Sequence, residues 1–323
     1  MRKLLTARLL RRDVVHAISA VVETLKIHSV EGDVHCGRPV LVKTHHATGG
    51  QIAKLANFYF SLAEIPIRYC SGARAWQRWG IKCYRMLNGD QFKAVRVGKH
   101  TICEDRLPGE SLWDHMKRGT LSRRMLKAAA VELHRAHQIW SHELGGLWSH
   151  GDASMPNVLY DKRSNRARLI DFEIMHVKSL PAEVRHADDV LVFLLDMIDT
   201  VRKCDWLPFA ICFIKAYGDA RVIAELKGRL AVPNGLARIW WEVRTNFAKT
   251  AKVKRRLEAL RKALHALKLY PAVPARTRKR RRPSITCQIT SPGIPTASSH
   301  ARSIKESANA VSPGMPRRFP TRR

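Results

Sequence analysis

The sequence predicts an α+β fold with two lobes, a small strand-containing lobe followed by a mainly helical one, and a disordered basic tail after them. Three observations support this prediction. Short apolar runs separated by turn residues recur within residues 1–110. Amphipathic stretches with helical spacing dominate residues 111–270. Residues 271–323 are rich in Pro, Ser and Arg and lose apolar periodicity, and such a composition cannot bury enough surface to fold.

Length and hydrophobic content are ordinary, whereas the charge is extreme. A chain of 323 residues, 45% of them hydrophobic, has room for a two-lobed unit of about 250 residues with additional segments. The net charge of +31 comes from 58 Lys and Arg against 27 Asp and Glu. Residues 271–323 hold 12 basic residues and one acidic residue, so most of the excess lies in residues 1–270. Such a field attracts anions of any kind and does not choose among nucleotides, nucleic acids and lipid head groups.

The cysteines and the N-terminal region indicate a cytoplasmic protein, with association with a membrane surface left open. Seven cysteines are scattered without a C-x-x-C pair, which favours reduced thiols over a disulfide framework. Arg8, Arg11 and Arg12 interrupt the apolar region that a signal peptide would need. No run approaches the ~18 apolar residues of a membrane span, so we expect no transmembrane segment.

The elements of the first lobe follow from short-range patterns. Residues 39–44 form an apolar run that ends near Lys43, typical of a buried strand presenting a lysine at its end. Residues 51–63 have helical spacing, and residues 73–86 continue in a second helix. Residues 92–97 and 101–105 are expected to form two strands around a turn.

The elements of the second lobe are mostly helices. Residues 121–140 place apolar side chains on one face, with Thr120 or Ser122 as the N-cap. The remaining expected elements are two short strands at 158–160 and 167–170, a helix at 190–197, a helix at 206–217 that stops at Gly218, and an amphipathic helix at 253–267.

The most informative stretch lies between these elements. Residues 150–157 read H-G-D-x4-N, and residues 171–173 read D-F-E after two apolar residues. An aspartate, an asparagine and a second aspartate in this order suit metal-assisted phosphoryl transfer. One carboxylate orients or deprotonates the acceptor hydroxyl, while an amide and a carboxylate hold Mg²⁺ against the nucleotide phosphates. Oxygen ligands of this kind are those that magnesium prefers.

This pattern resembles the protein kinase-like superfamily, whose members carry H-R-D-L-x-x-x-N and D-F-G. The glycine after His150 resembles the atypical kinases that act on small molecules, the aminoglycoside phosphotransferase and lipopolysaccharide kinase families. The resemblance implies transfer of the γ-phosphoryl group of ATP, with Mg²⁺, to a hydroxyl of a small molecule or a lipopolysaccharide-type glycan. It assigns nucleotide binding to residues 1–110, and catalysis and acceptor binding to residues 111–270.

The resemblance also gives each site residue an expected role. Asp152 would act on the acceptor hydroxyl, and His150 would hold the shape of the loop. Asn157 and Asp171 would bind Mg²⁺. Those four residues stand in the motifs themselves.

Further roles depend on position along the chain. Lys43 is the candidate for the phosphate-binding lysine, with Lys54 and Lys93 as competitors. Glu104 and Asp105 precede an L-P-G segment and would lie at the lobe junction, where backbone groups meet adenine. Either Asp188 or Asp189 would hydrogen-bond the backbone of the H-G-D loop; the alternative is an acidic first turn that complements a helix dipole. The residues in question are Lys43, Lys54, Lys93, Glu104, Asp105, Asp188 and Asp189.

Departures from the family pattern keep other functions open. No G-x-G-x-x-G precedes Lys43, and Glu64 is the one acidic residue between Lys43 and Asp90, so a pseudokinase scaffold is an alternative. A protein Ser/Thr kinase is a second alternative, because the loop does not define the acceptor. The Arg-rich run at 276–282 raises a third, a nucleic-acid-binding protein, and the tail could contact nucleic acid or anionic lipid.

Overall fold

The computed structural model describes residues 27–267, except residues 36, 90 and 202. The chain divides into two compact units, Met1–Ala275 and Arg276–Arg323, and every described element belongs to the first. The predicted disordered tail at 271–323, with its Arg-rich run, lies outside the described residues.

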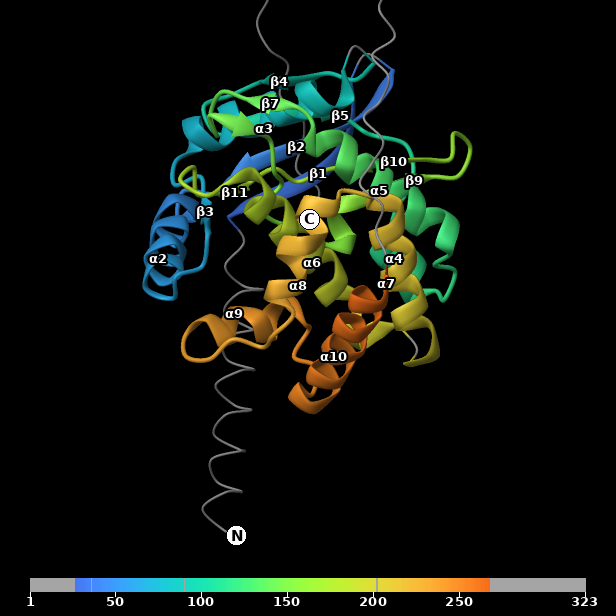
Figure 1. The fold of residues 1–323 in the computed structure, drawn as a ribbon. Helices are drawn as coiled ribbons and strands as arrows, with labels where there is room; N and C mark the ends of the chain where they lie inside the picture. Colours follow the sequence, from blue (N-terminus) through green and yellow to red (C-terminus); the bar gives the residue numbers. More distant parts are fainter. Residues whose placement is uncertain (1–26, 36, 90, 202, 268–323) are drawn as a thin grey trace, which may run out of the picture. The chain divides into compact units, whose positions relative to one another are not determined.

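The first part of the described chain is built on an antiparallel sheet of four strands, in the spatial order β1-β2-β5-β4 (Figure 1). Two helices and a short strand interrupt the sheet in sequence. The predicted strand at 39–44 and the helices at 51–63 and 73–86 are confirmed. The elements are β1 (His28–His35), β2 (Arg38–His45), α2 (Gly49–Leu62), β3 (Ile67–Tyr69), α3 (Ala73–Asn88), β4 (Ala94–Arg96) and β5 (Thr101–Asp105).

Helix α3 shows why the sheet is buried on one side. Its Trp76, Trp79, Cys83 and Leu87 recur at helical spacing and are all buried, so one stripe of α3 faces the core. Gly89 ends the helix with a backbone φ of 59°, a conformation that glycine adopts without strain.

The second part is mainly helical and surrounds a small three-stranded sheet in the order β10-β9-β6. Its core is dense along α6, where all residues from Ala187 to Ile198 are buried. Helix α5 packs against α7, and α6 packs against α8. The elements are β6 (Glu110–Ser111), α4 (Leu112–Lys117), α5 (Arg123–His137), β7 (Trp140–Ser141), β8 (Gly146–Leu147), a 3-10 turn (Met155–Asn157), β9 (Val158–Asp161), β10 (Arg166–Leu169), β11 (Ile174–His176), α6 (Ala182–Thr200), α7 (Lys203–Tyr217), α8 (Ala220–Arg229), α9 (Ala237–Arg244) and α10 (Thr250–Ala266).

The predicted helices at 121–140 and 190–197 have the wrong bounds. The helix expected at 121–140 begins after Ser122, whose hydroxyl accepts a hydrogen bond from the Met125 N–H, and ends at His137. It cannot continue to Trp140, because Trp140 pairs with Leu147 in the β7–β8 hairpin. The helix expected at 190–197 begins earlier, at Ala182. Residues 188 and 189 therefore lie inside α6, and the alternative of an acidic first turn is wrong.

A two-stranded sheet ties the first part of the chain to the D-F-E segment. Strand β3 pairs with β11, so that Tyr69 lies opposite Ile174. The Cys70 N–H also donates to the carbonyl oxygen of Glu173 at 3.2 Å. These backbone bonds fix the chain at Glu173 and in the three residues that follow it. None of the helices in the described ranges combines the length and apolar character needed to cross a bilayer.

The L-P-G segment makes one sharp prediction about stability. Gly109 has a φ of 110°, and a Cβ added there would lie 2.6 Å from the Tyr160 carbonyl group. Gly119 has a φ of 69° but nothing within 4 Å of its added Cβ. Gly109→Ala should therefore lower the free energy of unfolding by about 2–5 kcal/mol, and Gly119→Ala by about 1 kcal/mol. Urea denaturation of both variants measures this; equal losses would show that the close approach at Gly109 is unimportant.

Candidate active site

A cleft of about 660 Å³ opens between one face of the four-stranded sheet and the loops of the helical part. The sheet face follows from strand alternation, because residues two apart on a strand point to the same side. Val30 pairs with Lys43, and Lys43 pairs with Ile102, so the three strands contribute alternate residues to this face. The cleft-lining residues from the sheet are His28, Val30, Gly32, Leu41, Lys43, Glu104 and Asp105.

Lys43 lies at the centre of this face, where two carboxylates neutralise it. Its Nζ is 3.1 Å from Glu104 Oε2 and 3.8 Å from Asp171 Oδ1. Burial alone would lower the pKa of Lys43, but the charges of Glu104 and Asp171 outweigh burial and raise that pKa. The ammonium group therefore stays charged. Its competitors, Lys54 and Lys93, are both exposed and do not line the cleft.

Glu104 is the carboxylate partner that reasoning from sequence missed. The partner does not lie between Lys43 and Asp90, where Glu64 is the one acidic residue, but in β5. Because Leu41 pairs with Glu104 while Lys43 pairs with Ile102, Glu104 is the diagonal neighbour of Lys43 across the sheet. The β2–β5 register is the signal that would have found this pair.

Glu104 and Asp105 line the cleft, yet their polar groups are engaged within the first part of the chain. The Asp105 N–H donates to the Lys93 carbonyl, and the Lys93 N–H donates to the Asp105 carboxylate, both at 2.8 Å. The Tyr84 hydroxyl donates to the Asp105 carbonyl oxygen. The backbone N–H and carbonyl oxygen of Asp105, which were expected to meet adenine, are therefore already hydrogen-bonded to Lys93 and Tyr84.

His150 shapes the H-G-D loop through both ring nitrogens. Its Nε2 lies 3.0 Å from the carbonyl oxygen of Ile170, and its Nδ1 lies 3.3 Å from the Asp152 nitrogen. A ring protonated on Nε2 satisfies both contacts, donating to Ile170 and accepting from Asp152. The imidazole thus links the loop to the residue that precedes Asp171. Gly151 between them has a φ of 87°, and a Cβ there would lie 3.1 Å from Ile174, which suits glycine.

The carboxylate of Asp189, on α6, also holds the H-G-D loop in position. Its carboxylate accepts hydrogen bonds from the backbone N–H groups of His150 at 2.7 Å and Gly151 at 2.8 Å, and it lies 3.0 Å from His137 Nε2. Burial would raise the pKa of Asp189, but the nearby His176 and His137 hold it well below its ordinary value. Of the two aspartates considered, Asp189 therefore makes the loop contacts.

Asp188 points to a different partner, Arg244 at the end of α9. The Arg244 guanidinium lies 3.3 Å from Asp188 and 3.4 Å from the Gly151 carbonyl oxygen. The sequence does not predict a contact of Arg244 with the loop, because no local motif marks an arginine that is 93 residues away from Gly151. Burial opposes ionisation of Asp188, but Arg244 and His176 lower its pKa to about 2.

Asp152 and Asn157 lie against each other across the loop. The Asn157 Nδ2 donates to the carbonyl oxygen of Asp152 at 3.0 Å and to its Oδ2 at 2.9 Å. This arrangement uses the amide donor and leaves the amide oxygen as a ligand atom. Burial raises the pKa of the Asp152 carboxyl.

Asp171 is the last of the four motif residues, and its backbone has a conformation that few non-glycine residues adopt. Its φ of 67° lies in the left-handed region, which aspartate tolerates better than most residues. Its side chain is 31% exposed, and both Asp171 and Asn157 line the cleft. A carboxylate and an amide oxygen, with room for water and phosphate oxygens, fit the coordination chemistry of Mg²⁺. All four motif residues therefore lie together.

Comparisons with known proteins add two remote structural likenesses. No protein-family model matches the chain, and no curated protein matches its sequence. An ethanolamine kinase of Plasmodium vivax is similar over 73% of this chain and 82% of its own, with 10% identity and a TM-score of 0.38. The structure of Rv3197 from Mycobacterium tuberculosis in complex with erythromycin is similar over 76% and 75%, with 17% identity and a TM-score of 0.33.

These TM-scores are low, so the fold assignment depends on the arrangement seen in this chain. An antiparallel sheet presents Lys43 to Asp171 across a cleft. A mainly helical part carries the H-G-D loop and anchors it by Asp189 of α6. The described chain therefore has the strand-containing first part and the mainly helical second part that the sequence predicts, an arrangement that fits a kinase-like fold.

The Asp188–Arg244 pair predicts how stability depends on pH. A carboxyl whose pKa falls to about 2 from the ordinary 3.8 stabilises the folded state above the ordinary value and loses that contribution as pH falls toward 2. Asp188→Asn should therefore be less stable than the wild type by on the order of 2 kcal/mol near neutral pH. The difference in free energy of unfolding between the wild type and Asp188→Asn should become smaller below about pH 4.

Urea denaturation from neutral to acid pH measures the gap between the two proteins. The exposed Glu31→Gln variant is the control and should follow the wild type at every pH. A gap for Asp188→Asn that stays constant over the whole range would contradict the ion-pair assignment.

Proposed function

We propose that the protein is a phosphotransferase that moves the γ-phosphoryl group of ATP, with Mg²⁺, to a hydroxyl of a small molecule or a lipopolysaccharide-type glycan. The observation that carries this proposal is the meeting of Lys43, Glu104 and Asp171 at the cleft, within 3.1 and 3.8 Å, beside the paired Asp152 and Asn157. Phosphoryl transfer needs positioned charges more than it needs covalent chemistry.

On this proposal, the sheet face binds the nucleotide. A volume of about 660 Å³ lies within the ~300–1,000 Å³ typical of small-molecule sites. Val30 and Leu41 offer apolar surface for the base, and Lys43 offers a cation for the phosphates. Glu104 keeps the ammonium group in place. Residues 1–110 would form the nucleotide-binding lobe, and residues 111–270 the lobe that binds the acceptor.

The loop residues would perform the transfer. Asn157 and Asp171 would hold Mg²⁺, which when bound neutralises the phosphate oxygens. Asp152 would orient the acceptor hydroxyl and take its proton, since a buried carboxyl with a raised pKa is a better base than an ordinary one. Asn157 fixes the Asp152 carboxylate by donating to Oδ2. His150 and Asp189 would act as positioning residues, because they hold the loop rather than face the cleft.

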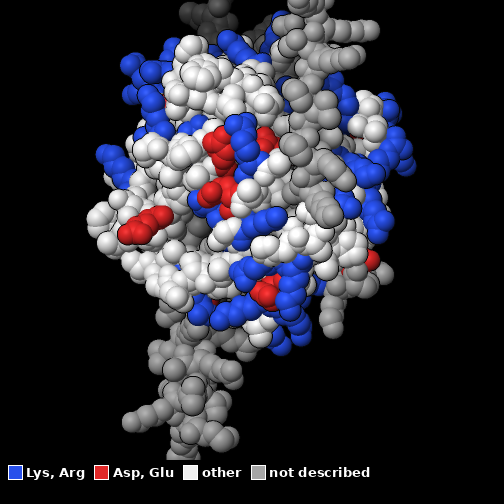
Figure 2. All heavy atoms as spheres, viewed as in Figure 1, with Lys and Arg blue, Asp and Glu red and all other residues white. Residues whose placement is uncertain are grey.

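The alternative functions differ in what supports them. The Lys43–Glu104 pair removes one motive for a pseudokinase, the absence of a glutamate partner. A protein Ser/Thr acceptor is the remaining rival for the substrate. For nucleic-acid binding, Figure 2 shows Lys and Arg spread over many parts of the face that it draws rather than gathered in one track, and the Arg-rich run at 276–282 lies outside the described residues.

Two substitutions separate metal binding from transfer. Asp171→Asn should lose the thermal stabilisation that Mg·ATP gives the wild type, because it removes a metal ligand. Asp152→Asn should keep that stabilisation but lose turnover by at least about 10²-fold, because it removes the base. Thermal shift and ATP turnover with a panel of hydroxyl acceptors measure these effects.

The exposed Asp33→Asn variant is the matched control and should behave like the wild type. Both active-site variants behaving like the wild type in both assays would overturn the assignment. Binding of Mg·ATP without turnover on any acceptor, in the wild type itself, would favour the pseudokinase.

The Lys43–Glu104 contact gives a separate prediction for nucleotide binding. Glu104→Gln keeps the shape of the side chain but removes the negative charge that holds the Lys43 ammonium group in place. We expect ATP affinity to fall roughly 10- to 100-fold, the equivalent of one charge-assisted hydrogen bond. Calorimetric titration with ATP measures the change. Glu110→Gln, at the rim of the same cleft and paired with Arg118, is the control, and an equal loss in both variants would argue against a specific role for Glu104.

A further inference from the structure

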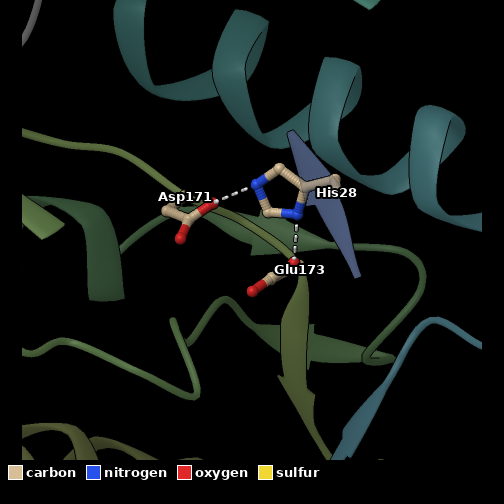
Figure 3. Close-up of side chains that lie close together, drawn as sticks. All are labelled: His28, Asp171 and Glu173. Atoms are coloured by element: carbon tan, nitrogen blue, oxygen red, sulfur yellow. Dashed lines mark ion pairs between the residues drawn. The ribbon is translucent and has the colours of Figure 1, made fainter. Parts of the chain in front are cut away.

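A second group of ionisable side chains lies beside Asp171, and the proposed transfer does not use it. His28 comes from β1, and Glu173 is the third residue of the D-F-E segment (Figure 3). One ligand atom from each of His28, Asp171 and Glu173 can be chosen so that all three atoms lie within 4.8 Å of one another. Figure 3 shows the imidazole ring lying between the two carboxylates.

The three side chains lie close enough together to hold one ion, to which the imidazole would contribute one of its two nitrogens. His28 Nδ1 lies 2.8 Å from Glu173 Oε2, and His28 Nε2 lies 3.9 Å from Asp171 Oδ1. When bonds to a metal are about 2.0–2.2 Å long, neighbouring ligand atoms lie about 3–4 Å apart. The two contacts involve different ring nitrogens, but one nitrogen and one oxygen from each carboxylate still lie within 4.8 Å of one another.

Two of these atoms form a buried ion pair with each other. His28 Nδ1 and Glu173 Oε2 are 2.8 Å apart, and no other hydrogen-bond partner of either atom lies in the described part of the chain. Buried polar groups are nearly always satisfied. Because these two atoms have no other hydrogen-bond partner among the described residues, both could turn toward a common ion without breaking a further bond.

The surrounding structure holds each ligand in position. The His28 ring contacts Trp76 of α3, with 5.7 Å between ring centroids, and the His28 side chain is 11% exposed. Glu173 is anchored through its carbonyl oxygen, which accepts from Cys70. Alternation along β1 places His28 on the cleft side, two residues before Val30. The group is thus built from three separate segments of the chain.

We propose that His28, Asp171 and Glu173 bind a divalent transition-metal ion at a site distinct from that of the nucleotide Mg²⁺. An imidazole nitrogen with two carboxylates suits ions such as Mn²⁺ or Zn²⁺, whereas Mg²⁺ prefers oxygen ligands alone. The two sites share Asp171 but differ in their other residues. The proposal rests on the proposed function only through that shared residue, because Asn157 and Asp152 have no part in it.

The test uses Mn²⁺ as the probe and the full chain as the protein. Electron paramagnetic resonance measures Mn²⁺ affinity, and electron spin echo modulation detects ¹⁴N of a directly bound imidazole. We expect the wild type to show the ¹⁴N signal without nucleotide. His28→Phe should lose the signal and bind Mn²⁺ at least about tenfold more weakly, since even the loss of outer-shell partners commonly has that effect. Glu173→Gln, which preserves shape, should also weaken binding.

Two control variants separate this site from the rest of the cleft. His45→Phe removes another buried ring that contacts Trp76, with 5.5 Å between centroids, and should keep the ¹⁴N signal. Asn157→Ala should keep it too while impairing Mg·ATP turnover, so failure of the metal proposal and failure of the proposed function remain distinguishable. Mn²⁺ bound without ¹⁴N coupling, or a signal that survives in His28→Phe, would overturn the proposal, as would the absence of Mn²⁺ binding in the wild type.

Discussion

The buried carboxylate of Asp189 is the constraint on which the site depends. It comes from the middle of α6, is 0% exposed, and accepts two backbone N–H groups of the H-G-D loop. A buried charge that lost these partners would be destabilising by several kcal/mol, so the loop is held in one conformation. That conformation directs the two nitrogens of His150 toward Ile170 and Asp152. The position of Asp171 is therefore coupled, through His150, to a charge inside the helical core.

The register of the strands determines where the remaining side chains of the site lie. Three strands with a fixed pairing place His28, Lys43 and Glu104 on one face, and the β3–β11 pairing fixes the chain after Asp171 from the other side. Because a slip of one residue would turn every side chain to the opposite face, the ion pair of Lys43 with Glu104 could not survive it. The cleft thus depends on pairing between strands that are about sixty residues apart in sequence.

The contrast between what sequence predicts and what it misses has a physical cause. The four motif residues are close in sequence, so their spacing is enough to predict that they lie together: His150, Asp152, Asn157 and Asp171. The choice between Asp188 and Asp189 is different: neighbouring residues on a helix point about 100° apart, and both were plausible until the helix was placed. Glu104, Arg244 and His28 act through register or packing over long separations, and no local pattern encodes those contacts. The start of α6 was misplaced because its first turns lack a continuous apolar run.

The charge of the chain and the charge of the site act over different distances. A net charge of +31 attracts anions from solution, but its effect weakens within a Debye length of about 8 Å at physiological salt. Inside the cleft the nearest fixed charges are largely acidic, and Lys43 is already paired with Glu104 and Asp171. Phosphates approaching Asp171 would meet repulsion unless a cation lay between them. On the proposed function, a basic surface with an acidic centre would favour anions that arrive together with a divalent metal.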